Sequence, residues 1–386
     1  MKKWIDEYCV GCGLCETYNK AKCKEDEKGF LHPYEGDEEW LEKVCPAGGY
    51  QQKNMDFSKI WGKTRQIFLG WSQNTEVRQT ASSGGVITEI CCWMLQNKYA
   101  DAILHTCVDD IDPTKTKCCE SVIAEEVRLR CGSRYSISHP LSKISKINKE
   151  KKYVFVGKPC DIVVLKNYMN LHPEMENTII LTISFFCAGL PSIDAQDRLL
   201  SFLECKKDNL MALRYRGDGW PGYTTAIDNT GKEYKTDYNS SWGKILGRDI
   251  MKMCRFCLDG IGEQADISCG DAWHLNEKNE PDFSEGEGRN VIFTRTEKGQ
   301  KIIEKMSSDQ CIHTEPMKRE ELKFIQLYQW ERRATMLDKI FALKLFRKPV
   351  PKYSLMQLLC YTKEIKCTCH LRIFLGTVKR ILNGKI

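Results

Sequence analysis

The stretch CVGCGLC, residues 9–15, places three cysteines in one short loop with two residues between each pair. Thiols spaced this closely suit three corners of an iron–sulfur cube better than a zinc tetrahedron, whose ligands usually come as two separated pairs. Gly11 and Gly13 let the backbone curl, so that its N–H groups can point at sulfide sulfurs. The stretch therefore predicts an iron–sulfur cluster loop, and a zinc knuckle is the competing interpretation.

Two cysteines further along can supply the fourth thiol of this cluster. Cys45 is followed by Pro46 and comes after a predicted amphipathic helix over residues 38–44. A Cys-Pro ending is usual at the fourth position of a ferredoxin-type site, because proline fixes the turn that aims the thiolate. Cys23 lies in a lysine-rich stretch without a proline, so we favour Cys45 and keep Cys23 as the alternative. The predicted ligands of the first cluster are Cys9, Cys12, Cys15 and Cys45.

Four later cysteines are placed for a second cluster. Two of them, Cys160 in VGKPCDI and Cys187 in FFCAG, directly follow predicted strands. Open α/β sheets keep their sites at these carboxyl ends. The sequence CRFC then adds Cys254 and Cys257, which gives the four thiolates that a second cubane cluster requires.

A turn of small residues, SSGGV at residues 82–86, lies between a predicted strand at 67–72 and a predicted helix. The free N–H groups at the start of such a helix can receive a phosphate or the edge of a flavin. The same residues also form an ordinary N-cap that allows close helix packing. The turn alone therefore leaves both interpretations open.

Two later stretches are also of interest. Arg216 and Trp220, in a glycine-rich segment, could clamp an anionic planar ligand, or they could form a packed hairpin corner. A turn at residues 229–231 is predicted to join two strands. The run 266–271, which contains two aspartates and a glycine, is expected to be a turn whose acidic groups could contact a ring edge or a substrate.

Length and composition set the broad class of protein. The 386 residues suffice for two or three domains, and a net charge of +6 does not imply nucleic-acid binding. No apolar run is long enough to span a bilayer and the first residues lack a signal-peptide pattern, so we expect a cytoplasmic protein. In such a chain, 21 cysteines indicate metal clusters and scattered buried thiols rather than disulfides.

After Trp330 the composition becomes basic, and amphipathic helices with leucine and phenylalanine on one side are predicted. Such a tail can lie on an anionic membrane as a peripheral contact, dock a partner protein, or pack on its own domain. Packing on its own domain is the commonest of these outcomes.

The ordered set of motifs resembles the coenzyme F-420 hydrogenase/dehydrogenase beta subunit family, which also includes the plastid 7-hydroxymethyl chlorophyll a reductase. The resemblance spans residues 2–306 and rests on CVGCGLC, SSGGV, CGSRY, VGKPCDI, FFCAG and CRFCLDGIGEQADISCGD. Members often carry two cluster motifs at the N-terminus, whereas this chain has one. Its basic tail is more similar to bacterial members from polysaccharide loci, which argues against a deazaflavin substrate.

The resemblance implies an oxidoreductase in which 4Fe-4S clusters exchange single electrons with FAD, and the flavin exchanges a hydride with a second substrate. Its implied partners are a ferredoxin or redox partner subunit and a small-molecule or glycan-linked substrate. The alternative is a non-catalytic electron-transfer subunit or a cluster-containing docking protein. No catalytic acid or base stands out. The residues that would line the flavin are Ser82, Ser83, Gly84, Gly85, Val86, Ser133, Gly157, Lys158 and Pro159.

These expectations combine into a mixed α+β or α/β fold in four parts. Residues 1–56 would form a small ferredoxin-like 4Fe-4S module, and 57–145 the N-terminal part of an FAD-binding catalytic domain. Residues 146–330 would form its C-terminal part with the second cluster, and 331–386 the basic helical tail.

Overall fold

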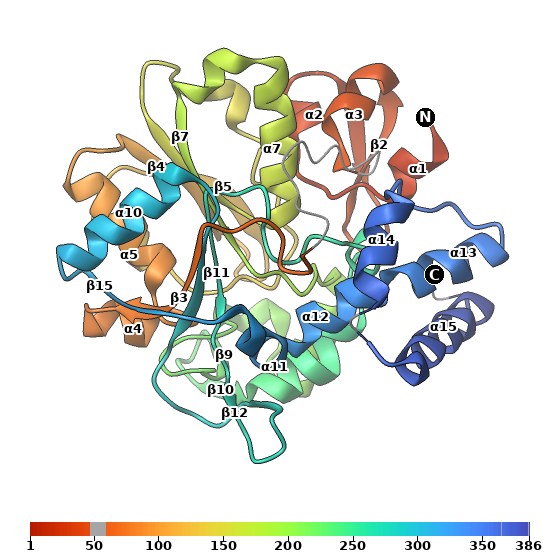
Figure 1. Ribbon diagram of the computed structural model, residues 1–386. Helices are drawn as coiled ribbons and strands as arrows, with labels where there is room; N and C mark the ends of the chain where they lie inside the picture. The colour runs from red at the N-terminus through yellow and green to blue at the C-terminus, as the bar shows by residue number, and fades with distance from the viewer. Residues whose placement is uncertain (47–58, 364, 385) are drawn as a thin grey trace.

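The computed structural model describes residues 1–46, 59–363, 365–384 and 386. An eight-stranded mixed sheet lies at its centre and confirms the predicted mixed α/β class (Figure 1). In spatial order its strands are β15 (Ile312–Pro316), β3 (Gln66–Ser72), β14 (Asn290–Thr294), β11 (Ile267–Asp271), β7 (Ile179–Phe185), β6 (Tyr153–Gly157), β4 (Ala102–Val108) and β5 (Thr116–Ser121). The expected boundary between residues 56 and 57 lies outside the described residues.

Five strands of this sheet point the same way. β6 pairs in parallel with β4 and β7, and β7 pairs in parallel with β11. β14 is antiparallel to both β11 and β3, which makes β3 parallel to β11. The carboxyl ends of β3, β11, β7, β6 and β4 therefore share one edge of the sheet, where sites of α/β folds usually lie.

Each face of the sheet has its own apolar core, because successive strand residues point to opposite faces. Tyr153 and Phe155 enter one core while Val154 enters the other. The second core is closed by α5 (Val86–Gln96), α6 (Ala124–Leu129) and α10 (Glu297–Ser308). The first is closed by α7 (Pro159–Leu171), the N-terminal module and the C-terminal helices.

The N-terminal module begins the chain and packs against α7. Its elements are α1 (Lys3–Glu7), α2 (Leu14–Thr17), β1 (Ala21–Glu25), β2 (Leu31–Gly36) and α3 (Glu38–Val44). The predicted helix at 38–44 is confirmed, and the Asp37 carboxylate caps it by accepting from the Trp40 N–H. Asn167 of α7 donates to the Val44 carbonyl at 3.0 Å, which fixes the end of α3 against the main domain.

A second, three-stranded sheet packs below the carboxyl edge of the first (Figure 1). The predicted turn is confirmed, since the Gly231 N–H donates to the Asp228 carbonyl between two antiparallel strands. The elements here are α8 (Ile193–Phe202), β8 (Leu210–Arg214), β9 (Thr224–Asp228), β10 (Glu233–Thr236), α9 (Lys252–Arg255) and the short pair β12 (His274–Leu275) and β13 (Pro281–Asp282).

The run 266–271 was expected to be a turn, and this was wrong. Residues Ile267–Asp271 form the central strand β11, which pairs with β7 on one side and β14 on the other. Ile267 and Cys269 are buried in the second core, and this burial outweighs the turn preference of the aspartates and glycine.

The C-terminal segment folds as helices, as predicted, and packs on the first core. It comprises α11 (Leu322–Ile325), α12 (Leu327–Ala334), α13 (Met336–Leu345), α14 (Leu355–Thr362) and α15 (Cys367–Leu382), whereas α4 (Thr75–Thr80) connects β3 to α5. It also reaches the N-terminal module, because the Tyr8 hydroxyl donates to the Pro349 carbonyl at 2.5 Å. No helix in the described part of the chain is long and apolar enough to cross a membrane.

Candidate functional site

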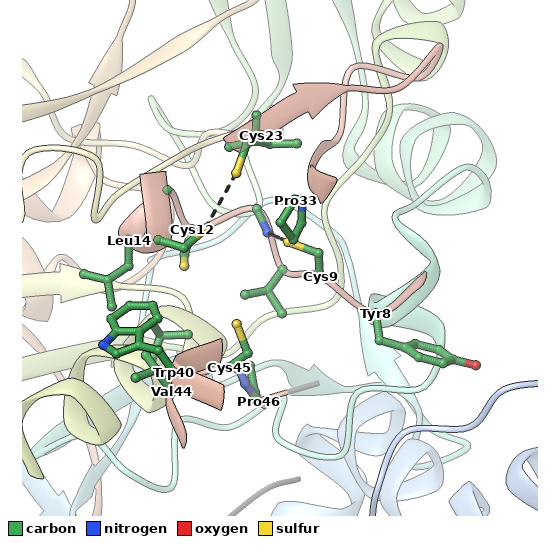
Figure 2. Close-up of a pocket in the computed structure, with 16 residues that line it drawn as sticks. Tyr8, Cys9, Cys12, Leu14, Cys23, Pro33, Trp40, Val44, Cys45 and Pro46 are labelled. Carbon is green, nitrogen blue, oxygen red and sulfur yellow. Dashed lines mark hydrogen bonds between the residues drawn. The ribbon is translucent and has the colours of Figure 1, made fainter. Parts of the chain in front are cut away.

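The N-terminal module contains a hollow lined by five cysteines, which we call the first hollow. Cys9 and Cys12 come from the loop before α2, Cys15 from α2, Cys23 from β1 and Cys45 from the end of α3. Figure 2 shows thiols from both sides of this space. The structure thus brings together the four predicted ligands of the first cluster and the alternative, Cys23.

The loop around this hollow depends on its two glycines. Gly11 and Gly13 have φ values of 63° and 83°, a left-handed conformation that residues with a Cβ rarely adopt. The curled backbone lets the Gly11 N–H donate to the Cys9 sulfur at 3.3 Å. Cys15 and Cys23 lie with their sulfurs 3.6 Å apart. Of the two glycine N–H groups predicted to face sulfide, that of Gly11 points at a sulfur of the loop, and this sulfur belongs to a cysteine.

A second hollow lies beside the carboxyl edge of the main sheet. Cys160 is in the first turn of α7, and Cys187 follows β7 by two residues. Cys254 lies in α9 and Cys257 just after it. All four line the second hollow, so the structure brings the predicted ligands of the second cluster together.

One arginine of the tail connects the cysteines of the second hollow. The buried Arg332 of α12 donates from Nε to the Cys257 carbonyl at 2.9 Å, from Nη1 to the Cys187 carbonyl at 3.0 Å, and from Nη2 to the Cys254 carbonyl at 2.7 Å. Sequence reasoning missed this residue and assigned it to the basic tail. Its partners lie 75 to 145 residues away, so no local spacing could have indicated it.

Burial controls the charge of these thiols. It raises the pKa of Cys9 and Cys254 to about 12 and that of Cys257 to about 11, and it raises the pKa of Cys45 well above the ordinary thiol value. The positive charge of Arg332 acts in the opposite direction on Cys254 and Cys257. Without a bound cation these four thiols are therefore neutral at pH 7, and binding a cluster would release protons.

The donor sets fit iron–sulfur clusters. Each hollow offers at least four thiols, and thiolates are the ligands that hold such clusters in proteins. Among the described residues, no three His, Cys, Asp or Glu side chains converge closely enough to hold a single metal ion. The thiols stand around a space instead of meeting at one point.

The two hollows are immediate neighbours. The buried Val10 lines both of them. Met251 lines the second hollow, and its terminal methyl would lie 3.5 Å from a Cβ added to Gly11, which lines the first. One layer of side chains therefore separates the two sets of thiols.

The predicted flavin turn lies at the carboxyl end of β3. Gly85, with φ at 75°, is the N-cap residue of α5, and the Val86 N–H donates to the Asn290 side chain at 3.3 Å. The Ser133 N–H donates to the Ser82 hydroxyl at 2.6 Å, which joins two of the predicted segments. Ser82, Ser83, Gly84, Gly85, Val86 and Ser133 are thus assembled at one place.

The backbone of this turn retains hydrogen-bonding capacity. Within the described chain, the N–H groups of Ser83, Gly84 and Gly85 have no acceptor, although both glycines are buried. Buried N–H groups are nearly always paired, so these donors fit an acceptor-rich ligand such as a flavin or its phosphates.

The other predicted flavin residues lie at the turn between β6 and α7. Lys158 is buried and contacts the Ser138 hydroxyl at 2.8 Å and the Asp161 carboxylate at 2.9 Å. Lys158 and Pro159 line the second hollow, and Gly157 ends β6. The nine residues predicted to line the flavin therefore form two groups on the same edge of the sheet. One group lies at the end of β3 and the other at the end of β6, and the strands β14, β11 and β7 lie between them.

Arg216 and Asp271 pair with each other. The Arg216 guanidinium donates to both Asp271 carboxylate oxygens at 2.9 Å, and the Trp220 indole N–H donates to the same carboxylate at 2.8 Å. Trp220 also stacks on Trp273 at 4.9 Å. This pairing favours the packed-corner interpretation over a free arginine clamp, and it occupies Asp271.

Two family models match this chain. Residues 67–146 match the model of the coenzyme F420 hydrogenase/dehydrogenase beta subunit N-terminus, and residues 150–320 match that of its C-terminus. Together the two matches include residues of all eight strands of the central sheet and the four cysteines of the second hollow.

Individual relatives are distant. The coenzyme F420 hydrogenase subunit beta of Methanococcus voltae is 22% identical over 252 residues, 64% of this chain and 82% of that protein. The chloroplastic 7-hydroxymethyl chlorophyll a reductase of Oryza sativa subsp. japonica is 22% identical over 302 residues, 77% of this chain and 60% of that protein. A chain of the xenon-derivatised F420-reducing [NiFe] hydrogenase complex from Methanosarcina barkeri shares the fold, with a TM-score of 0.58, 19% identity, and coverage of 75% of this chain and 96% of that one.

Proposed function

The chain belongs to the coenzyme F420 hydrogenase/dehydrogenase beta subunit family, and from this membership we propose that it is an iron–sulfur flavoprotein oxidoreductase. It would pass electrons between a ferredoxin-like donor or redox partner subunit and an unidentified small or glycan-linked substrate, by way of two 4Fe-4S clusters and FAD. Relatives that are named as a hydrogenase subunit and a reductase support an oxidoreductase activity in general. We place this activity in the cytoplasm.

The proposal rests chiefly on the two thiol-lined hollows with Val10 as their shared wall. When bound, the clusters would supply one-electron carriers, and FAD would convert single electrons into two-electron chemistry on an organic substrate. Two such carriers separated by one side chain suit electron transfer better than two isolated structural sites would.

The residues of the chain have defined tasks in this proposal. Cys9, Cys12, Cys15 and Cys45 would hold the first cluster, and Cys160, Cys187, Cys254 and Cys257 the second. The free N–H groups of residues 83–85 would bind the flavin. Arg332 would keep the loops of the second hollow in place and add positive charge beside it.

The direct test is metal and flavin analysis of anaerobically purified protein. We expect about eight irons and one FAD per chain, and about four irons in Cys254→Ser. Cys311→Ser, which changes a thiol outside both hollows, should leave the iron content unchanged. Zinc without flavin would overturn the proposal, and eight irons without flavin would leave an electron-transfer subunit.

A further inference from the structure

Two helices of the C-terminal tail carry large apolar side chains on their outer surface. Phe341 and Leu345 of α13 and Leu371, Leu375 and Leu382 of α15 are 54% to 69% exposed. We call these five residues the apolar patch. Side chains of this size are commonly buried, so a concentration of them on one surface marks an interaction site.

The apolar patch is one continuous surface. Residues spaced by four or seven positions lie on the same side of a helix, which applies to Leu371, Leu375 and Leu382 and to the pair on α13. The two helices pack together, and the rings of Phe341 and Phe374 lie 5.8 Å apart.

The opposite sides of these helices are already used for packing. Ile340 and Leu343 of α13 and Ile381 of α15 belong to the first apolar core. The patch is therefore a second apolar surface in addition to the one that attaches the helices. Packing on its own domain, one of the outcomes predicted for the tail, accounts for the inner surface only.

Basic side chains accompany the apolar patch. Lys344, Arg347 and Lys348 are exposed at the end of α13, and Lys379 and Arg380 are exposed on α15. Residues 336–386 contain 11 lysines and arginines but only two acidic residues. Within the part of the chain that the structure describes, these five basic side chains form no ion pair with an acidic side chain.

We propose that the apolar patch docks on an anionic lipid surface. Leucine and phenylalanine side chains would enter the boundary between headgroups and acyl chains, and the neighbouring lysines and arginines would contact the anionic headgroups. The binding is peripheral. The charge of the tail selects the lipid: a neutral bilayer would use the apolar side chains alone, whereas an anionic one also uses the basic ones.

Vesicle sedimentation with the full-length, cofactor-loaded protein tests this directly. We expect binding to vesicles of phosphatidylcholine with a third phosphatidylglycerol, and binding at least about a hundredfold weaker to phosphatidylcholine alone, because five basic side chains lose their anionic partners. Raising the salt from about 0.1 M to about 0.5 M should weaken binding to the anionic vesicles about tenfold, because it shortens the screening length.

Paired variants separate the two contributions. Leu371→Glu with Leu375→Glu should lower the partition coefficient at least about tenfold on both kinds of vesicle. Lys344→Gln with Lys379→Gln should lower it on anionic vesicles only, by about tenfold or more. Leu129→Glu is the matched control, because Leu129 is 85% exposed on α6, which covers the other face of the sheet.

Folding of each variant is checked by circular dichroism and by the midpoint of thermal unfolding, so the result does not depend on whether the proposed enzymatic function is correct. No binding to anionic vesicles, or binding that the Leu371 and Leu375 changes leave intact, would overturn the proposal. Light scattering gives a second test. A wild-type dimer that the Leu371 and Leu375 changes convert to a monomer would also overturn the proposal, because a second copy of the chain would then cover the apolar patch.

Discussion

The two cysteine-lined hollows are built in opposite ways. All five thiols of the first hollow lie between Cys9 and Cys45, in a module of short helices and one hairpin. The four thiols of the second come from three separate segments between Cys160 and Cys257. Arg332, from a fourth segment, then connects three of those cysteines through their carbonyl groups. The first hollow is a local structure, and the second is a product of the whole fold.

This difference indicates where each hollow is sensitive to change. The first has a spare thiol, since Cys23 lies 3.6 Å from Cys15, so one of its five cysteines is dispensable in our proposal. The second hollow, with four thiols, has no fifth cysteine among its lining residues in the described chain. The predictions below test this contrast.

The largest effect should come from Cys45→Ser. It removes the favoured fourth ligand, so we expect the loss of about four irons per chain, measured by iron analysis and the absorption spectrum. Cys23→Ser is the matched control in the same hollow and should keep all the iron. If the two variants behave the other way round, Cys23 is the fourth ligand and Cys45 is the spare thiol.

Arg332→Met should lower the free energy of unfolding by about 3–5 kcal/mol, because three partly buried carbonyl groups lose the charged donor that the buried arginine supplies. The reduction potential of the second cluster should fall, since a positive charge that favours the added electron is gone. Denaturant titration and a potentiometric titration measure the two effects. Arg372→Met, at an exposed arginine on α15, should change stability by less than about 0.5 kcal/mol. An unchanged potential in Arg332→Met would assign Arg332 a structural role only.

Gly84→Ala should weaken flavin binding by about ten- to a hundredfold and leave the iron of both hollows in place. A Cβ at this position would lie 2.7 Å from the Asn290 side-chain oxygen and 2.9 Å from the Arg289 Cα, so the turn must shift. Flavin fluorescence after equilibrium dialysis measures the effect. Gly286→Ala is the control, since its Cβ would meet nothing within 4 Å. Full flavin retention in Gly84→Ala would argue against the turn as the flavin site.

The smallest effect on stability is expected for Val10→Ala, about 1–2 kcal/mol for the two methyl groups removed. Val164→Ala is the matched control, because Val164 lines the first hollow and not the second. Both should reduce stability to a similar extent in denaturant titrations. Only Val10→Ala should alter the magnetic coupling between the two reduced clusters in electron paramagnetic resonance spectra. Equal spectra for both variants would contradict a shared wall between the clusters.

Much of this architecture could be predicted from local sequence. The CVGCGLC loop, the helix at 38–44 and the strand, turn and helix around residues 67–97 have the spacing and residue types that their structures require. The position of Cys160 and Cys187 after strands was enough to place both at one edge of the sheet. In each case the information lies within one element and its immediate neighbours.

The parts that could not be predicted depend on distant partners. Residues Ile267–Asp271 look like a turn, and become a central strand because strands on both sides bury them. The sequence suggests that the acidic groups of this run could contact a ring edge or a substrate, whereas in the structure Asp271 pairs with Arg216. Arg332 looked like one more basic residue of a helical tail.

The role of Arg332 also has a consequence for the order in which the protein can mature. During synthesis, the thiols of the first hollow have all been made once Cys45 is translated. The second hollow has its last thiol at Cys257, but the arginine that holds its loops is translated 75 residues later. A ribosome that stalls between these points would carry all the thiols of the first hollow and a second hollow without its arginine. In our proposal, insertion of a cluster at the second hollow would then follow the synthesis of Arg332.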